Sequence, residues 1–309
     1  MKLSSIFKKK SNSLKVKSPS DIIFPIIFIV LLMYSLVLCV LLLWGVFTSF
    51  KAPGLADYDF NKAGLPKEWV FDNYKSVADQ LHYIISVKGV GQVKLGAHLI
   101  IGYTLLYTVG CAFFATLSPC LVAYVVAKFG KKYKFFNIYT SVVIVCMIIP
   151  IVGNYPSELQ VARTLGLYDS IPGMWIMKAH FLTMYYLVFL GAFQGMPDGY
   201  AEAAKIDGAG DFLVFVRIYF PLVIKTFLTI MLIQFVVFWN DYQTPILYLE
   251  SYPTLAFWLY KFMYEPPSNT IAEPEWIAAI MILIVPMVVV FIAFSDRVMG
   301  NMSLGGLKE

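Results

Sequence analysis

The chain has 309 residues, of which 59% are hydrophobic and only 14% are charged, and its mean hydropathy is +0.72. This composition excludes an ordinary soluble domain and indicates a protein that crosses a membrane several times. We attribute the net charge of +5 to the placement of Lys and Arg around the membrane, and not to nucleic-acid binding.

Six apolar runs, most of them longer than the roughly 20 residues needed to cross a bilayer, predict six spans. Each should be a helix, because no water is present in the bilayer core to satisfy lipid-facing backbone groups. We therefore expect an all-α membrane protein with six transmembrane helices. The runs lie near residues 22–50, 97–127, 135–157, 173–195, 224–249 and 276–295.

Lys and Arg cluster in two places, and such clusters are expected on the cytoplasmic side. Six spans then return the C-terminal tail, residues 296–309, to the cytoplasm as well. Residues 51–96 and 250–275 fall outside, the first as a small amphipathic cap and the second as a shaped, aromatic and proline-rich loop. The basic residues are Lys2, Lys8, Lys9, Lys10, Lys15 and Lys17 in the N-terminal segment 1–21, and Lys128, Lys131, Lys132 and Lys134 after the second span.

Residues 197–222 form a charged, glycine-broken segment between two apolar runs. Pro197 and Asp198 suit a first helical turn, Gly208 suits the end of the helix, and Asp211 is placed to cap a second helix. We expect a short helix, a sharp turn and a second helix beneath the bilayer. Small alanines and the acidic Glu202 and Asp207 would suit contact with a basic partner protein, although a generic loop on the membrane surface explains the composition equally well.

The same segment resembles the EAA motif of bacterial ABC-importer permeases. Other stretches resemble the carbohydrate-uptake branch, in particular the smaller membrane subunit of maltose transporters, from about residue 97 to the end. One departure is Lys225, where a further proline is usual. The motif residues are Glu202-Ala203-Ala204, Asp207-Gly208-Ala209, Phe215, Ile218 and Pro221-Leu222, and the branch residues include Ile149-Pro150, Trp239-Asn240-Asp241-Tyr242 and Pro253-Thr254-Leu255-Ala256.

This resemblance implies a type I ABC-importer permease in the bacterial plasma membrane, with residues 97–295 as the permease core after a first transmembrane helix at 22–50. It implies as partners a second permease, two ATPase subunits, an extracytoplasmic solute-binding protein and membrane lipid. The implied coupling helix seats on the ATPase through Glu202, Ala203, Ala204, Asp207, Gly208, Ala209 and Gly210.

The chain contains no GxxxxGK[ST] phosphate loop, so we expect ATP and Mg to be bound by the partner ATPase and no cofactor in this chain. We also expect no catalytic residue. All four cysteines fall inside predicted spans, and no metal-ligand spacing is visible. The sequence thus predicts a transport subunit and not an enzyme.

Polar side chains at the end of the fifth predicted span are candidates for the translocation path, because polar groups within spans usually face the bundle interior or water. Aromatic rings there could stack on sugars, and amides could bind hydroxyls. An alternative role is hydrogen bonding to neighbouring helices or to a partner subunit. The candidates are Trp239, Asn240, Asp241, Tyr242, Gln243 and Thr244.

Two other functions remain as alternatives to a carbohydrate importer. An ABC permease for a non-sugar solute would share the coupling motif. An ion-coupled secondary transporter would need titratable groups at mid-membrane, for which Asp241 is thin support. A membrane-embedded enzyme is disfavoured, because the three histidines are scattered and form no catalytic set.

Overall fold

The chain is predominantly helical in the computed structural model, which describes residues 19–54, 57–87, 89, 91–130, 133, 135–149, 153–265 and 271–302. The basic residues before position 19, Lys131, Lys132, Lys134 and Pro150 lie outside this range. The elements are α1 (Pro19–Ser49), α2 (Asp72–Gln80), β1 (His82–Val87), β2 (Gly91–Gly96), α3 (Ala97–Phe129), α4 (Phe135–Ile148), α5 (Tyr155–Thr164), α6 (Ile171–Met177), α7 (Met184–Gln194), α8 (Gly199–Ile206), α9 (Asp211–Val214), a π-helical turn (Phe215–Tyr219), α10 (Phe220–Trp239), α11 (Gln243–Tyr248), α12 (Leu255–Tyr264) and α13 (Glu273–Met302).

Four helical segments within the described part of the chain are long and apolar enough to cross a membrane: Ile23–Ser49, Ala97–Phe129, Asp211–Trp239 and Glu273–Phe294. They match four of the predicted spans. The other two predicted spans are divided. The run 135–157 contains the shorter α4 and the start of α5, and the run 173–195 contains most of α6 and all of α7. The fifth span also ends early, at Trp239. The separate helix α11 begins at Gln243, and the Thr244 amide in its first turn donates a hydrogen bond to the carboxylate of Asp241 (3.0 Å).

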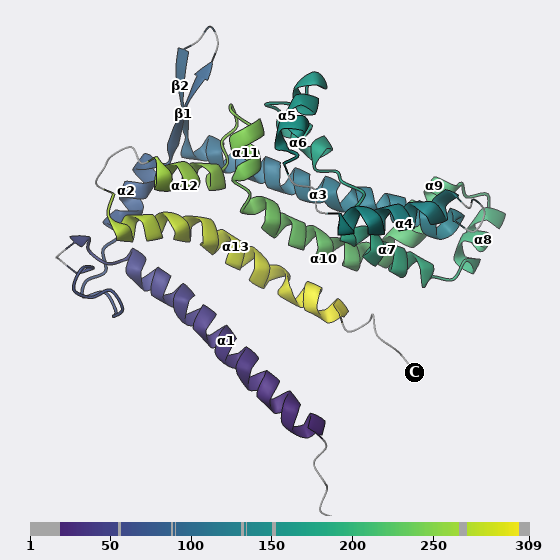
Figure 1. The fold of residues 1–309 in the computed structure, drawn as a ribbon, viewed down its shortest axis with the longest axis horizontal. Helices are drawn as coiled ribbons and strands as arrows, with labels where there is room; N and C mark the ends of the chain where they lie inside the picture. The colour runs from purple at the N-terminus through teal and green to yellow at the C-terminus, as the bar shows by residue number, and fades with distance from the viewer. Residues whose placement is uncertain are drawn as a thin grey trace, which may run out of the picture.

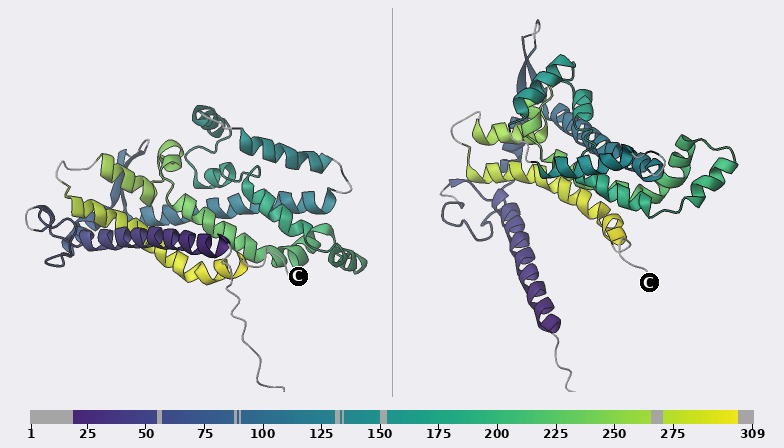
Figure 2. Two further views of the ribbon diagram at one scale, coloured as in Figure 1. Left: turned by 60° about the horizontal axis from the view of Figure 1, so that its bottom comes forward. Right: turned by 45° about the vertical axis from the view of Figure 1, so that its right-hand side comes forward.

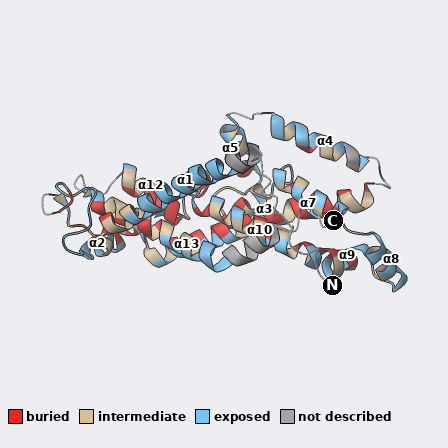
Figure 3. Cartoon of the chain, turned by 90° about the horizontal axis from the view of Figure 1, so that it is seen from below, coloured by how far each residue is buried: buried red, intermediate tan, exposed pale blue. Residues whose placement is uncertain are grey.

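Helix α3 lies at the centre of the bundle, with α7 and α10 packed along it and α13 against α10 (Figure 1). The helices α1 and α13 lie on one side of α3 and α10, and α5 and α6 lie on the other side, in both views of Figure 2. Helix α4 lies at the margin of the bundle (Figure 3) and contacts α7 through a hydrogen bond between the hydroxyls of Thr140 and Tyr186 (2.8 Å). Half of the most apolar 18-residue stretch of α3 is buried, whereas no residue of the corresponding stretch of α1 is buried. Helix α1 therefore contacts the bundle only near its C-terminal end.

The close contact of α1 is made at a glycine. A Cβ atom at Gly45 would lie 2.9 Å from the Cε of Met281 in α13, so a larger residue there would require the flexible end of the Met281 side chain to move. Figure 1 shows that α1 begins on the side of α8 and runs toward α2, and that α13 returns in the opposite direction.

Residues 51–96 differ from the all-α expectation, because they contain an antiparallel hairpin of β1 and β2 as well as α2. The register pairs His82 with Gly96 and Val87 with Gly91. Strand β1 carries Tyr, Ile and Val, which favour extended backbone, and Gly91 has the positive φ of 93° that suits glycine at the turn. The helix requirement applies to lipid-exposed backbone, and the hairpin projects away from the bundle near α2 and α12 (Figure 1).

The loop expected at 250–275 contains a buried helix, α12, which packs beside α2 and the start of α13 at the hairpin end. A cluster of buried side chains, including Trp239, Trp258 and Phe262, joins these elements. A second cluster around Tyr124, Phe193 and Tyr219 lies at the opposite end, next to α8 and α9. Each end of the bundle therefore has its own cluster of buried side chains.

Candidate functional site

The predicted helix, turn and second helix are present in segment 197–222. Helix α8 ends at Ile206, and Gly208 follows with φ at +86°, a left-handed conformation that glycine adopts without steric cost. The Ala209 amide donates to the Ala204 carbonyl (2.9 Å), which closes the turn. The chain can then reverse sharply into α9.

The start of the second helix differs from the prediction in one detail. Gly210, not Asp211, occupies the N-cap position, and it provides no side-chain cap. Asp211 lies inside the first turn, where its negative charge is favourable, and forms an ion pair with Lys205 of α8 (2.7 Å). Helix α9 continues through the π-helical turn 215–219 into α10, so the segment connects directly to a membrane-spanning helix.

The segment divides into an exposed face and a packed face. Ala204 and Ala209 are half-buried against the cluster around Tyr124. Glu202, Ala203, Asp207, Gly208 and Gly210 are exposed, and α8, all of whose residues are described, contains no buried residue. The motif residues therefore present their charged and small groups to the outside.

Two exposed apolar side chains lie at the tip of the segment and were not singled out from the sequence. Ile206 is 87% exposed and Phe212 is 77% exposed. Large apolar groups so far from any core are a feature of interaction surfaces. Their exposure could not be read from the hydrophobic pattern, because Ile206 and Phe212 look like core positions in a sequence this apolar.

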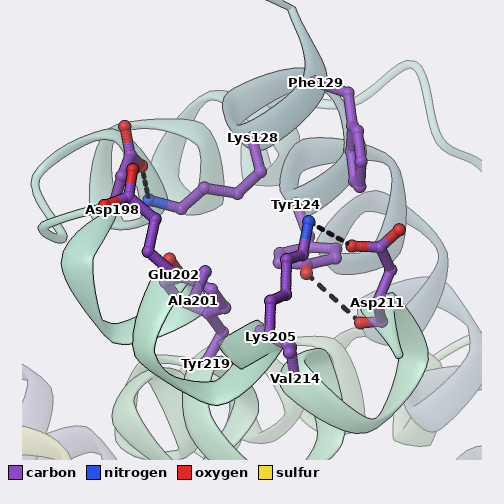
Figure 4. A pocket seen from close by; sticks show the side chains of 10 residues that line it. All are labelled: Tyr124, Lys128, Phe129, Asp198, Ala201, Glu202, Lys205, Asp211, Val214 and Tyr219. Atoms are coloured by element: carbon purple, nitrogen blue, oxygen red, sulfur yellow. Dashed lines mark hydrogen bonds and ion pairs between the residues drawn. The ribbon is translucent and has the colours of Figure 1, made fainter. Parts of the chain in front are cut away.

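Lys128 at the end of α3 connects the segment to the bundle. Its Nζ donates to the Met196 carbonyl (2.9 Å), forms an ion pair with Asp198 (2.9 Å) and lies 4.6 Å from the centre of the Tyr219 ring. Figure 4 shows this lysine reaching Asp198 on one side of a small cavity, with the Lys205–Asp211 pair on the other. The Lys128 side chain is only 9% exposed. Because it joins the end of α3 to the segment, we name Lys128 with these contacts the α3 brace.

The cavity in Figure 4 has a volume of about 220 Å³ and is lined by groups of both signs. Tyr124 forms part of its floor and donates a long hydrogen bond to the Asp211 carbonyl (3.5 Å). The α3 brace and this tyrosine therefore connect α3 to Asp198, which precedes α8, and to Asp211, which begins α9.

The aromatic candidates for the translocation path are engaged elsewhere. Trp239 is 6% exposed, and its Nε1 donates to the Leu283 carbonyl of α13 (3.0 Å). Tyr242 is stacked on Tyr260 of α12 with the ring centroids 4.8 Å apart. In contrast to the expectation, the indole of Trp239 is not free to stack on a sugar, because it fills the contact between α10 and α13.

The polar candidates serve the junction of α10 and α11. One oxygen of Asp241 accepts a hydrogen bond from the Thr244 amide in the first turn of α11, and the other accepts one from the Tyr107 hydroxyl of α3 (2.7 Å). The side-chain amide of Asn240 donates to its own helix, at the Val236 carbonyl (2.9 Å). Gln243 is exposed, and of the six candidates Thr244 lines a cavity described below.

The described residues contain no cluster of three or more His, Cys, Asp or Glu side chains that could hold a metal ion. The four cysteines are free thiols, and Cys111 and Cys120 are buried in α3.

Comparison with known proteins adds relatives along most of the chain. The permease NgcG of a diacetylchitobiose uptake system from Streptomyces coelicolor is 24% identical over 90% of this chain and 87% of its own length. The melibiose, raffinose and stachyose import permease MelC from Bacillus subtilis is 27% identical over 84% of this chain and 88% of its own. The sn-glycerol-3-phosphate permease UgpE from Yersinia enterocolitica is 30% identical, over 41% of this chain and 44% of its own.

A chain in the crystal structure of a bacterial ABC transporter that imports the acidic polysaccharide alginate has the same fold. It superimposes with a TM-score of 0.68 over 91% of this chain and 98% of its own length, at 21% identity. The profile of the family described as binding-protein-dependent transport system inner membrane component matches residues 120–303. The chain belongs to this family of membrane-spanning permeases.

Proposed function

We propose that this chain forms half of the translocation path of an importer that takes a carbohydrate from a binding protein, and that residues 197–210 connect it to a separate ATPase. The observation that carries the coupling role is the exposed tip of segment 197–212. A helix with no buried residue, with exposed Ile206 at its end and exposed Phe212 in the helix that follows, is unusual unless another protein covers it.

The mechanism follows from the contacts of the segment. Closure of two ATPase subunits on ATP would draw α8 with it. The Lys128 contacts carry that displacement to α3, and the continuous path through α9 carries it to α10. Because α3 and α10 pack along each other at the centre of the bundle, both would tilt together and change the side on which the path is open.

The carbohydrate assignment is supported by the relatives, since NgcG and MelC are named for oligosaccharides. UgpE is named for a polyol phosphate, so import of a non-sugar solute is the second candidate function. Ion-coupled transport is not supported, because both oxygens of Asp241 are bound within the protein. The expected setting is the bacterial plasma membrane with both termini in the cytoplasm, on the side of α8.

Co-purification from the native membrane tests the coupling role. We expect the wild-type chain to bring an ATPase and a second permease with it, and Ile206→Asp to release the ATPase. Leu65→Asp is the matched control, because Leu65 is also exposed (64%) but lies in segment 51–96. Equal retention of the ATPase by both variants, or purification of the wild type as a lone chain, would overturn the proposal.

A further inference from the structure

A second cavity lies among α5, α6 and α11 and has a volume of about 400 Å³. Cavities that bind small molecules typically measure about 300–1,000 Å³. Helices α5 and α6 lie on the opposite side of α3 and α10 from the lipid-exposed α1 (Figure 2). The cavity is therefore placed away from the side on which α1 and α13 lie.

One wall of the cavity is apolar and the rim is polar. Val161, Leu165 and Met174 contribute to the wall, which suits the C–H faces of a pyranose ring. Hydroxyl, carboxylate, ammonium and imidazole groups contribute to the rim, from Ser157, Glu158, Lys178, His180 and Thr244. This combination of an apolar surface and a few convergent polar groups is typical of small-molecule sites.

Glu158 is held in place by hydrogen bonds. Its Oε1 accepts from the side-chain amide of Asn154, and its Oε2 accepts a long bond from the Tyr248 hydroxyl (3.4 Å). Tyr248 is 2% exposed, so the hydroxyl that aims at the carboxylate is fixed by packing. Glu158 remains half-buried and retains acceptor capacity toward the cavity.

The walls themselves are joined across the sequence. Asp169, in the turn between α5 and α6, accepts hydrogen bonds from the amide (2.8 Å) and hydroxyl (2.7 Å) of Ser251, and Tyr168 donates to Glu250 (2.6 Å). The Asp169 amide donates to the Tyr248 carbonyl (2.9 Å). These contacts fix the turn against the end of α11, so the cavity is preformed.

Lys178 follows α6 and lines the same cavity. Within the described part of the chain its ammonium forms no ion pair. An ammonium group has three donors and no acceptor, so it can bind oxygen atoms of a molecule that enters the cavity. Together with Glu158 it gives the cavity one fixed acceptor and one free donor whose charges offset each other.

We propose that this cavity is a solute-contact site in which Glu158 and Lys178 bind hydroxyl groups of a neutral oligosaccharide during its passage. The proposal rests on the proposed carbohydrate function. Hydroxyl groups both donate and accept, so they satisfy the carboxylate and the ammonium at once. The apolar wall on α5 and α6 contacts the sugar faces.

The test begins with the co-purified complex in liposomes, with its binding protein. Diacetylchitobiose, raffinose and melibiose are assayed for stimulation of ATP hydrolysis, and the sugar that stimulates most is prepared with a photoreactive diazirine group. We expect crosslinks, mapped by mass spectrometry, within residues 157–180 and at Thr244. Crosslinks confined to the second permease, or to other parts of this chain, would overturn the site while leaving the proposed function intact. If none of the three sugars stimulates hydrolysis, the carbohydrate function and the site fail together.

Variants then separate contact from structural support. Lys178→Met and Glu158→Gln should each lower the crosslinking yield by about tenfold, as expected for the loss of one charged hydrogen bond. Arg163→Gln is the matched control, because Arg163 is on α5 but lies over the Tyr168 ring (4.7 Å) and does not line the cavity. Unchanged crosslinking yields in both cavity variants would contradict the assignment.

Discussion

The helices α8 and α12 are similar in length and lie at opposite ends of the bundle, but they are held in different ways. Helix α12 buries Leu255, Phe257, Trp258 and other side chains, and Trp258 stacks on Phe262 at 4.9 Å. Helix α8 buries none of its described residues, and ion pairs on either side of it tie the segment to α3 and α9. Apolar burial therefore holds α12 in place. Polar contacts hold α8, and they leave the exposed apolar side chains of Ile206 and Phe212 available to a partner protein. The four substitutions below test this difference, from the largest expected effect to the smallest.

Trp258→Ala should have the largest effect. Its indole is 3% exposed and donates from Nε1 to the Gln80 carbonyl (3.2 Å), so truncation leaves a cavity and an unpaired carbonyl. We expect the free energy of unfolding to fall by roughly 3–5 kcal/mol. Thermal unfolding of the purified protein in detergent measures this loss. A decrease in Tm no larger than that of a variant at an exposed site would contradict the tight packing of α12.

Gly208→Val should have the second-largest effect, which arises from the backbone conformation and not from a steric clash. A Cβ atom there meets open space, but φ at +86° costs a residue with a side chain about 1–2 kcal/mol. We expect the turn to open and the amides of α8 to exchange hydrogen faster, while α12 is unaffected. Gly208→Asn is the control, because asparagine adopts this conformation more readily. Equal exchange in the two variants would exclude the turn geometry as the cause.

Lys128→Met removes the α3 brace and keeps an unbranched side chain of similar length. The ion pair is half open to solvent on its Asp198 side, so we expect a local loss of only about 1 kcal/mol. Exchange of the α8 amides should rise by about fivefold. Lys128→Arg retains the charge and should recover part of the protection. Protection unchanged in Lys128→Met would show that α8 is held by the packing of Ala204 and Ala209 instead.

Lys205→Ala should have the smallest effect. Both partners of the Lys205–Asp211 pair are about half exposed, at 50% and 55%, and pairs of this kind contribute about 0–1 kcal/mol. Hydrogen exchange of α8 and α9 should match the wild type within error. An effect equal to that of Lys128→Met would remove the distinction between the two lysines.

Local signals in the sequence determined the class of the protein and much of its architecture. The long apolar runs fixed the four long helices, because burial in a membrane requires length and low charge. Glycine at position 208, flanked by helix formers and followed by an acid, determined the helix, turn and helix of the coupling segment. The β-hairpin was missed because the helix rule for lipid-exposed backbone was applied to a segment outside the apolar runs.

Only the tertiary structure decided what the polar and aromatic side chains contact. Tyr107 and Asp241 are 134 positions apart, and Lys128 and Asp198 are 70 apart, so no local pattern links them. The same is true of Trp239, whose ring was expected to stack on a sugar but whose indole packs between helices. Helix formation depends on residues a few positions away in the sequence, whereas the contacts of a side chain depend on which helices the fold brings together. For that reason the coupling segment was visible in the sequence, and the cavity beside Glu158 and Lys178 was not.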